Sequence, residues 1–269
     1  MTFKKKIEKA ARLISESRRA VALTGAGVSA ESGISTFRDK GGIWDRYPEG
    51  DSGGIMAVMA NHPEDTSEIL MGFMDGMRAA RPNPGHKALA DLEEMGYLSS
   101  VITQNVDNLH REGGNSRVLE MHGNIYRLRC TVCEEKKILQ REAFFEMMSE
   151  LIMKTERFSP VEMISRLPLC SCGGNTRPDA VAFGEPVQDL QEAIAESKAC
   201  DLMLILGTSG VVYPAASLPS HARIEGARLI EINPQKSALT SKVDLFIEGK
   251  TGEILPRIVS LVKEMTTSQ

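Results

Sequence analysis

The sequence predicts an α/β fold: a doubly wound, mostly parallel, Rossmann-like sheet with a smaller inserted module that combines helices with two close pairs of cysteines. Apolar runs of strand length alternate with helical segments along most of the chain, which is typical of a parallel sheet covered by helices. A glycine-rich turn follows the first of these runs. The cysteine pairs fall in one stretch where the alternation stops, so we expect this stretch to fold as a separate module.

The spacing of apolar residues locates the individual elements. It predicts helices at 3–17, 84–94, 187–198, 214–224 and 251–263, and strands at 20–23, 98–103, 118–122, 180–183, 201–206, 227–232 and 243–247. The methionine-rich stretch 53–80 predicts one or two helices with an adaptable apolar face, and 140–167 is also expected to be helical. We expect one unit with a large domain (about 1–38, 84–123 and 180–269) and a small domain (about 39–83 and 124–179).

Composition and charge limit the possible classes of function. The 269 residues are 42% hydrophobic and 25% charged, which is ordinary for a globular protein. A net charge of −4 gives no reason to expect a specific nucleic-acid partner. No apolar run reaches membrane-spanning length and no secretory segment begins the sequence, so we expect a cytoplasmic protein without a membrane partner. The sequence leaves the oligomeric state open, and a monomer is compatible with it.

The first glycine-rich turn, Gly25 to Ala30, has the form G-x-G-x-x-(G/A) between a strand and an expected helix. Such a turn brings backbone N–H groups and a helix N-terminus to a phosphate. The same pattern also fits a tight strand–helix turn without a ligand. Ser29, Phe37 and Arg38 add a hydroxyl, an aromatic ring and a cation. This mixture favours a ligand that contains phosphate, ribose and a flat ring.

Polar residues also follow the other predicted strands. They are Gln104 to His110 after 98–103, His122 after 118–122, Gly207 to Ser209 after 201–206, and Asn233 after 227–232. Open α/β sheets bind ligands at the carboxyl ends of their strands, so these residues are expected to meet at one site. A lone histidine at a strand end would be structural more often than catalytic. The preceding Gln-Asn-x-Asp cluster favours a catalytic role for His122.

Four of the five cysteines form a candidate metal site. Cys130 and Cys133 are separated by two residues, and Cys170 and Cys172 by one. Four thiolates would hold one structural Zn²⁺ in a closed tetrahedral site. The alternative is a set of unrelated buried or redox-active cysteines. Cys200 begins an apolar run and is expected to be a core residue.

Together these residues resemble the sirtuins, a family of NAD-dependent protein lysine deacylases, from about Val21 to Glu253. The matching motifs, in family order, are Gly25–Ser29 with Gly33–Arg38, Thr103–His110, His122-Gly123, the cysteine pairs, Phe183–Glu185, Gly207–Ser209, Ile232–Pro234 and Gly249–Glu253. The resemblance implies that NAD is consumed and that acyl-lysine is converted to lysine, nicotinamide and an O-acyl-ADP-ribose.

The resemblance also implies roles for single residues. His122 is expected to act as general base on a ribose hydroxyl, Asn105 to order water and ribose hydroxyls, and Asp107, with Ile34, to hold the nicotinamide amide. Further contacts to NAD are expected from Gly25, Ala26, Gly27, Ser29, Phe37, Arg38, Gln104, Gly207, Thr208, Ser209, Asn233 and Thr251. The substrate peptide is expected to add a strand against Phe183, Gly184, Glu185, Val211, Val212 and Tyr213.

The chain departs from the family pattern in places. Ser35 stands where the family usually has proline, and the Cys170/Cys172 spacing is short. Leu70 and Phe73 stand where desuccinylase-type members carry tyrosine and arginine, so a neutral or apolar acyl group is expected rather than an acidic one. Two alternatives remain open at this point. One is a mono-ADP-ribosyltransferase or NAD glycohydrolase on the same fold, and the other is a non-catalytic NAD-sensing or zinc-dependent interaction protein.

Overall fold

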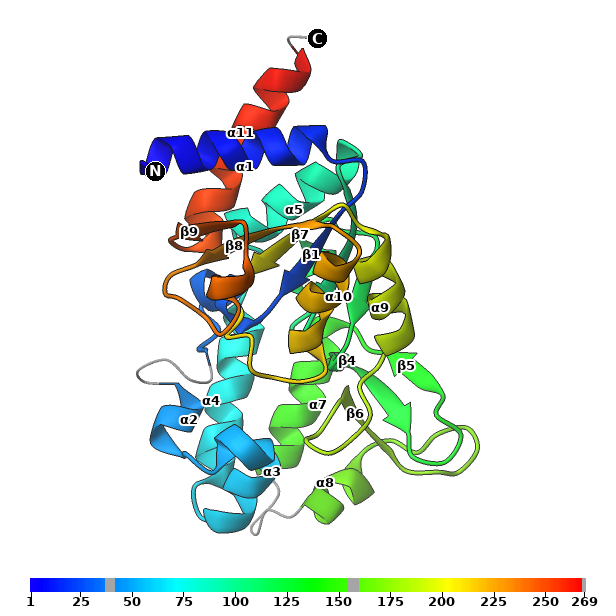
Figure 1. The fold of residues 1–269 in the computed structure, drawn as a ribbon. Helices are drawn as coiled ribbons and strands as arrows, with labels where there is room; N and C mark the ends of the chain where they lie inside the picture. Colours follow the sequence, from blue (N-terminus) through cyan, green and yellow to red (C-terminus); the bar gives the residue numbers. More distant parts are fainter. Residues whose placement is uncertain (37–41, 154–159, 268–269) are drawn as a thin grey trace.

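Figure 1 shows the computed structural model, which describes residues 1–36, 42–153 and 160–267. Its larger part is a six-stranded sheet in the order β3-β2-β1-β7-β8-β9. All of the strand pairings in this sheet are parallel. The strands are β1 (Ala20–Thr24), β2 (Leu98–Thr103), β3 (Val118–Glu120), β7 (Leu202–Leu206), β8 (Arg228–Asn233) and β9 (Leu245–Glu248). The predicted doubly wound, mostly parallel sheet is confirmed.

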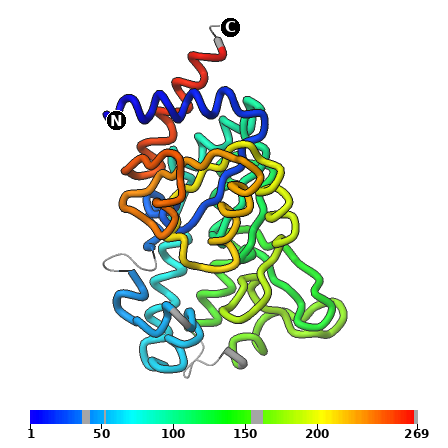
Figure 2. The backbone as a smooth tube through the Cα atoms, in the orientation of Figure 1, coloured from blue at the N-terminus to red at the C-terminus, as the bar shows by residue number. Residues whose placement is uncertain are grey.

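Helices cover both faces of this sheet. The apolar core on one face includes side chains of α1 (Phe3–Glu16), α5 (Pro84–Glu94) and α11 (Thr251–Thr267). The core on the other face includes side chains of α9 (Leu190–Ala199) and α10 (Leu218–Ile224). The central strands β1 and β7 are buried along their whole length, which is why they appear in the sequence as unbroken apolar runs. Figure 2 shows α1 and α11 crossing at one end of the molecule.

The smaller part combines a three-stranded antiparallel sheet with helices. The sheet has the order β5-β4-β6, with β4 (Gly123–Cys130), β5 (Lys136–Ile138) and β6 (Thr176–Ala180). The helices are α2 (Ile43–Arg46), α3 (Gly50–Asn61), α4 (Thr66–Ala79), α7 (Arg141–Met153) and α8 (Pro160–Arg166). One apolar core joins side chains of α3, α4, β4 and α7, among them Met74 and Phe144. The proposed boundaries between the two parts stay a prediction.

Two local predictions were wrong, and one predicted strand is present but shorter than expected. The segment 180–183 was expected to be a strand of the α/β alternation, but β6 ends at Ala180 and pairs antiparallel with β4. The chain then turns, with Glu185 N donating to Ala182 O over 3.0 Å and Gly184 at a φ of +87°. The strand expected at 118–122 ends at Glu120. The expected helix after β1 is replaced by two 3₁₀ turns, η1 (Ala26–Val28) and η2 (Ala30–Ser32).

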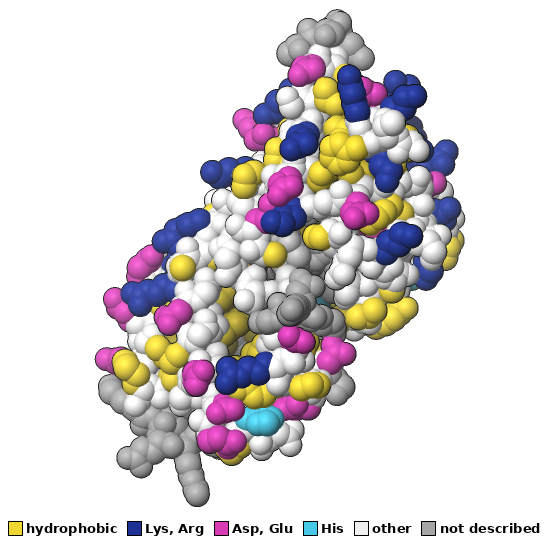
Figure 3. All heavy atoms as spheres, turned by 90° about the vertical axis from the view of Figure 1, so that its left-hand side faces the viewer, with side chains coloured by type: hydrophobic (Ala, Val, Ile, Leu, Met, Phe, Trp, Pro, Cys, Tyr) yellow, Lys and Arg dark blue, Asp and Glu magenta, His cyan; other side chains and the backbone are white. Residues whose placement is uncertain are grey.

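Further short turns are α6 (Leu109–Glu112), η3 (Ala215–Ser217) and η4 (Thr240–Lys242). Among the described residues, no helix is both long and apolar enough to cross a membrane. On the face shown in Figure 3, Lys and Arg side chains alternate with Asp and Glu side chains along most of the surface.

Candidate active site

The candidate site lies at the carboxyl ends of β1, β2, β7 and β8. Strand β1 lies between β2 and β7. The sheet extends through β2 and β3 to one edge and through β7, β8 and β9 to the other, so the strand order reverses at β1. Loops that diverge at such a switch point leave a crevice, where doubly wound sheets bind ligands. Most of the polar residues singled out in the sequence lie on these four loops. Phe37 and Arg38 lie outside the described residues.

The loops after β1 and β7 touch directly, and this contact requires glycine. Gly27 N donates to Gly207 O over 2.8 Å. A Cβ atom added to Gly27 would lie 2.8 Å from Gly207 O, and one added to Gly25 would lie 2.9 Å from the same atom. Both distances are too short for a carbon atom, so the two glycines are needed for the packing of one loop on the other. Because no long helix follows β1, the helix-dipole argument for a phosphate at this turn is wrong here.

Three polar side chains meet on the loops after β1 and β2. Ser29 Oγ donates to Asp107 Oδ2 over 2.6 Å, and Asn105 Nδ2 donates to Ser29 Oγ over 3.2 Å. The other oxygen of Asp107 accepts the Leu109 N–H at 2.9 Å. Asn105 Nδ2 also donates to Gly25 O over 3.1 Å. Asp107 is therefore held by fixed donors, with its position tied to the first loop.

Burial changes the acid–base behaviour of Asp107. The residue is only 5% exposed, and desolvation raises the pKa of its carboxyl group. The hydrogen bonds from Ser29 and Leu109 oppose this shift. A buried carboxylate of this kind suits the N–H donors of a ligand amide, because such donors stabilise its negative charge.

The geometry around His122 determines its tautomer. His122 Nδ1 lies 2.9 Å from Gln104 O, and a carbonyl oxygen only accepts, so Nδ1 carries the proton in the neutral ring. The lone pair is then on Nε2. Burial lowers the pKa of His122 below its usual value, while the hydrogen bond to Gln104 O raises it. The neutral ring, with Nε2 as a proton acceptor, is thus favoured near neutral pH.

The two other histidines near the site serve the packing of loops. His110 Nε2 lies 2.9 Å from Thr24 Oγ1, at the end of β1, and burial holds its pKa well below the usual value. His86 Nδ1 accepts the Asn83 N–H at 3.3 Å as part of a capping box at the start of α5. Burial lowers the pKa of His86 to about 4. Both rings therefore stay neutral.

A second group of polar residues gathers after β7 and β8. Gln104 Nε2 donates to Thr208 Oγ1 over 3.0 Å, and Asn233 Nδ2 donates to Thr208 O over 3.0 Å. Ser209 is exposed beside them. Thr251 Oγ1, at the start of α11, is buried and has no hydrogen-bond partner among the described residues. The next residue, Gly252, donates its N–H to Glu31 after β1, and an orphaned hydroxyl so close to the first loop fits a ligand with its own donors and acceptors, as a ribose has.

Two supporting residues, Glu31 and Asn83, were not among those expected from the sequence. Glu31, in η2, accepts the Gly252 N–H at 2.7 Å and so ties the first loop to the start of α11. Asn83 Nδ2 donates to Val28 O over 2.7 Å and to Ser32 Oγ over 2.9 Å. Asn83 before Pro84 carries a capping signal that could have been used. Glu31 has no such signal, because its partner is 221 positions away.

The two segments expected to bind peptide carry exposed side chains. Phe183 is 52% exposed, Val211 49% and Tyr213 71%. Val212 is half-buried between its neighbours. The Glu185 carboxylate accepts from Arg177 Nη2 at 2.6 Å and from Ala182 N at 3.0 Å, so this side chain stabilises its own turn. The exposed aromatic and aliphatic groups remain available to a partner.

The two α4 positions that were expected near the acyl group carry apolar side chains. Leu70 is buried and Phe73 is half-buried, and both belong to the apolar core of the small part. Ile34 and Val106, from the loops after β1 and β2, pack against the same core. The apolar core of the small part therefore extends to the loops after β1 and β2, next to the polar residues of the site.

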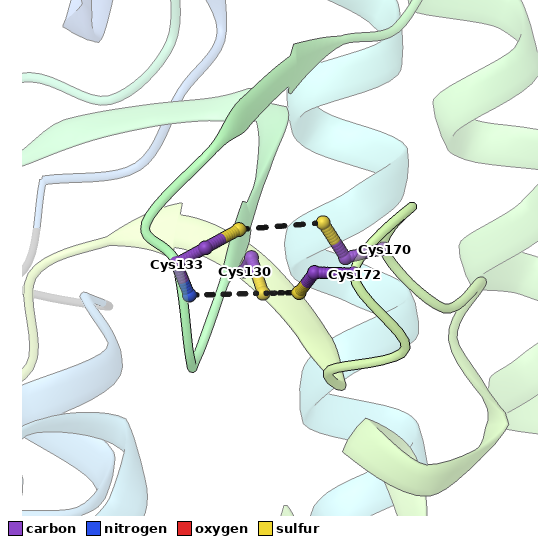
Figure 4. A group of neighbouring side chains, drawn as sticks. All are labelled: Cys130, Cys133, Cys170 and Cys172. Atoms are coloured by element: carbon purple, nitrogen blue, oxygen red, sulfur yellow. Dashed lines mark hydrogen bonds between the residues drawn. The ribbon is translucent and has the colours of Figure 1, made fainter.

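The four paired cysteines converge on one point, as Figure 4 shows. Cys130 Sγ lies 3.6 Å from Cys172 Sγ, and Cys133 Sγ lies 3.6 Å from Cys170 Sγ. All four sulfurs lie within 4.8 Å of one another. A tetrahedral zinc with Zn–S bonds of about 2.3 Å separates its sulfurs by ~3.8 Å, so the set fits Zn²⁺. The fifth cysteine, Cys200, is buried away from this set and donates to Ser197 O.

Comparison with known proteins agrees with this geometry. A family model described as the Sir2 family matches residues 25–214. An NAD-dependent protein deacylase of Desulfosudis oleivorans is 46% identical over 269 residues, and the match covers 98% of each chain. A solved Sir2 homologue–NAD complex is 38% identical, with a TM-score of 0.76, and the match covers 96% of this chain and 94% of that one. Sir2Af2 bound to a myristoylated histone peptide is 35% identical, with a TM-score of 0.70 and coverage of 99% and 100%.

Proposed function

The chain belongs to the Sir2 family and is an NAD-dependent protein deacylase, and we propose that it removes neutral or apolar acyl groups from lysine side chains with His122 as general base. The observation that carries the proposed role is the contact between His122 Nδ1 and Gln104 O, which leaves Nε2 free to accept a proton. The products are nicotinamide, the O-acyl-ADP-ribose and the deacylated lysine. NAD is a co-substrate, consumed in each turnover.

The first chemical step breaks the bond between nicotinamide and ribose. Positive charge develops on the sugar, and the acyl oxygen of the substrate attacks its anomeric carbon as the nicotinamide leaves with the bonding electrons. Asp107, with Ile34, holds the nicotinamide amide. Asn105 orders the ribose hydroxyls and a water molecule. This positioning supports the step because it keeps the weak acyl nucleophile next to the carbon and away from bulk water.

His122 acts in the second step. Its Nε2 takes the proton from a ribose hydroxyl, and that oxygen then attacks the carbon of the transferred acyl group. A neutral histidine is needed, and the lowered pKa of His122 keeps the ring neutral at the pH of the cell. Residues on the adenosine side, including Thr208, Ser209, Asn233 and Thr251, bind the rest of the NAD molecule together with Gly25, Ala26, Gly27, Ser29, Gln104 and Gly207. Phe37 and Arg38 complete the proposed set.

The substrate is an extended peptide of an acylated protein. It adds a strand between Gly184-Glu185 and the segment Val211 to Tyr213, so recognition uses mainly the peptide backbone. The acyl group lies against the apolar side chains near Leu70 and Phe73. An acidic acyl group would lose its hydration against these apolar side chains, so it is disfavoured.

The four cysteine thiolates hold one structural zinc ion. With four protein ligands, the metal supplies no open coordination position, and its role is to stabilise the fold of the small part. Val132 N and Cys133 N point at Cys130 Sγ, at 3.3 and 3.5 Å, and such donors favour the thiolate form that binds zinc. We place the enzyme in the cytoplasm, where thiols stay reduced, without a membrane or specific nucleic-acid partner.

The test is a panel of acyl-lysine peptides incubated with NAD and followed by mass spectrometry. Acetyl, butyryl and myristoyl peptides are expected to lose their acyl groups and succinyl peptides to keep theirs. Consumption of NAD with every peptide left intact would favour an NAD glycohydrolase or ADP-ribosyltransferase. Binding of NAD with no turnover of either substrate would favour the non-catalytic NAD sensor.

A further inference from the structure

One guanidinium bridges two buried carboxylates that flank His122. Glu120 ends β3, two residues before His122, and Asp179 on β6 pairs with Asn124, two residues after it. Arg127, on β4, donates from Nη1 to Glu120 Oε2 over 2.8 Å and from Nε to Asp179 Oδ2 over 3.0 Å. The Asp179 side chain is 0% exposed and that of Glu120 is 4% exposed. The bridge therefore joins β3 of the large sheet to β4 and β6 of the small sheet, and its two carboxylates belong to residues on either side of His122.

The backbone at His122 and Gly123 packs closely against β6. Val181 N donates to His122 O over 2.9 Å. A Cβ atom added to Gly123 would lie 1.9 Å from Asp179 O, and Gly123 has a φ of +81°. The chain thus passes from the large to the small part at His122-Gly123, directly against β6. A shift of β6 relative to β3 would move the His122 ring with it.

Other polar groups also donate hydrogen bonds to the two carboxylates. Glu120 Oε1 accepts from Asn124 Nδ2 at 2.8 Å and from Arg111 Nε at 3.3 Å. Asp179 Oδ1 accepts from Gln188 Nε2 at 2.7 Å. Arg127 alone reaches both carboxylates among the described ion pairs. Lys136 Nζ also lies 3.3 Å from Asp179 Oδ2, but Lys136 and Arg111 are each 40% exposed, whereas Arg127 is 18% exposed. Without Arg127 the two buried carboxylates would keep only these more exposed or more distant cations, which is unfavourable, so the bridge helps to set the relation between the two sheets.

We propose that Arg127 is a positioning residue for deacylation. By fixing β3 and β6 on either side of His122, it holds Nε2 within reach of the ribose hydroxyl. The inference rests on the proposed role of His122. A general base acts only within hydrogen-bond distance, and a displacement of about 1 Å can lower the rate by as much as ~100-fold. The NAD contacts proposed on the β1, β7 and β8 loops do not involve this bridge, so most of the affinity for NAD should be retained without it.

The experiment compares Arg127→Met and Arg127→Lys with the matched control Arg129→Met. Arg129 lies two residues along the same strand, is 22% exposed against 18% for Arg127, and makes longer ion pairs, at 3.7 Å to Asp179 and 3.9 Å to Glu185. We expect Arg127→Met to lower kcat about tenfold or more, with the calorimetric Kd for NAD within about twofold of wild type. Arg127→Lys should recover part of kcat, and Arg129→Met should lose less than about threefold.

A double variant separates positioning from stability. Glu120→Gln with Arg127→Met removes one carboxylate charge together with the guanidinium, so it should fold better than Arg127→Met alone and still have a low kcat. If the double variant recovered kcat together with thermal stability, the inference would be overturned. A kcat for Arg127→Met that is within twofold of wild type, or equal to that of Arg129→Met, would overturn it as well. An inactive wild type would overturn the proposed function and this inference with it, whereas an active wild type with an equally active Arg127→Met overturns the inference alone.

Discussion

His122 Nδ1 lies 2.9 Å from the backbone oxygen of Gln104, and this contact leaves Nε2 without its proton. It joins the end of β3 to the loop after β2, where Asn105 and Asp107 also lie. The same loop reaches Thr208 through the Gln104 side chain, at 3.0 Å. Gln104 therefore connects the proposed catalytic base with Thr208, on the loop after β7.

The pH dependence of the reaction should report on His122. The base works in its neutral form, so the rate rises with pH through the pKa of this histidine. Burial lowers that pKa below 6.5, so the acidic limb of kcat/KM is expected to have its midpoint below pH 6.5. Measurements between pH 5 and 8 with a neutral acyl peptide test this. A midpoint above pH 7 would contradict the assignment.

Asp107→Asn should separate function from stability. The amide cannot offer the nicotinamide two accepting oxygens, so we expect the KM for NAD to rise about tenfold and inhibition by nicotinamide to weaken. Because burial raises the pKa of Asp107, ionisation of the native carboxyl costs stability at neutral pH. The variant should thus have a higher Tm than wild type at pH 7, and this difference should shrink as the pH falls and Asp107 takes up a proton. An unchanged response to nicotinamide would refute the role.

Removal of one cysteine ligand should release zinc and weaken the fold. For Cys133→Ser we expect metal analysis to fall from about one zinc per chain to a trace, with a lower Tm and greater sensitivity to chelator. Cys200→Ala is the matched control, because this thiol is buried and bonded to Ser197 O. It should keep its zinc. Equal zinc content in both variants would argue against the four-cysteine site.

Gly27→Ala tests the contact between the loops after β1 and β7. The added Cβ would lie 2.8 Å from Gly207 O and Gly207 Cα, so the loops must separate. We expect a loss of about 1–3 kcal/mol in the free energy of unfolding and weaker binding of NAD. Gly72→Ala, in α4 with open space around it, should instead gain about 0.5–1 kcal/mol. Urea denaturation and calorimetry with NAD give both quantities, and an unperturbed Gly27→Ala protein would show that the loops adjust freely.

The sequence was sufficient to predict the α/β class and the convergence of the site, since both follow from local patterns. Apolar runs gave the central strands, and the rule that polar strand ends meet at one edge placed Asn105, His122 and Thr208 near one another. The resemblance to the sirtuins, which the Sir2 family match confirms, added the activity and the co-substrate.

The features that were missed depend on pairing over long distances. Strand β6 contains an arginine, a proline and an aspartate, and only its antiparallel partner β4 makes it a strand. Likewise, Gly25 and Gly27 fit a phosphate-binding pattern, but their tight packing against Gly207 depends on a loop about 180 positions away. The bridge from Arg127 to Glu120 and Asp179 has no local signal in the sequence either. The three residues come close together only once the large and small sheets have packed against each other.

The most direct test of the mechanism compares wild type with His122→Ala in two assays on the same acetyl-lysine peptide and NAD. Mass spectrometry follows loss of the acetyl group, and isotope-labelled nicotinamide follows exchange into NAD. Because the proposed mechanism uses His122 only after nicotinamide has left, the variant should lose peptide turnover by about a hundredfold or more while exchange of nicotinamide continues. Equal deacetylation by the variant and wild type would contradict the assignment of His122 as the general base.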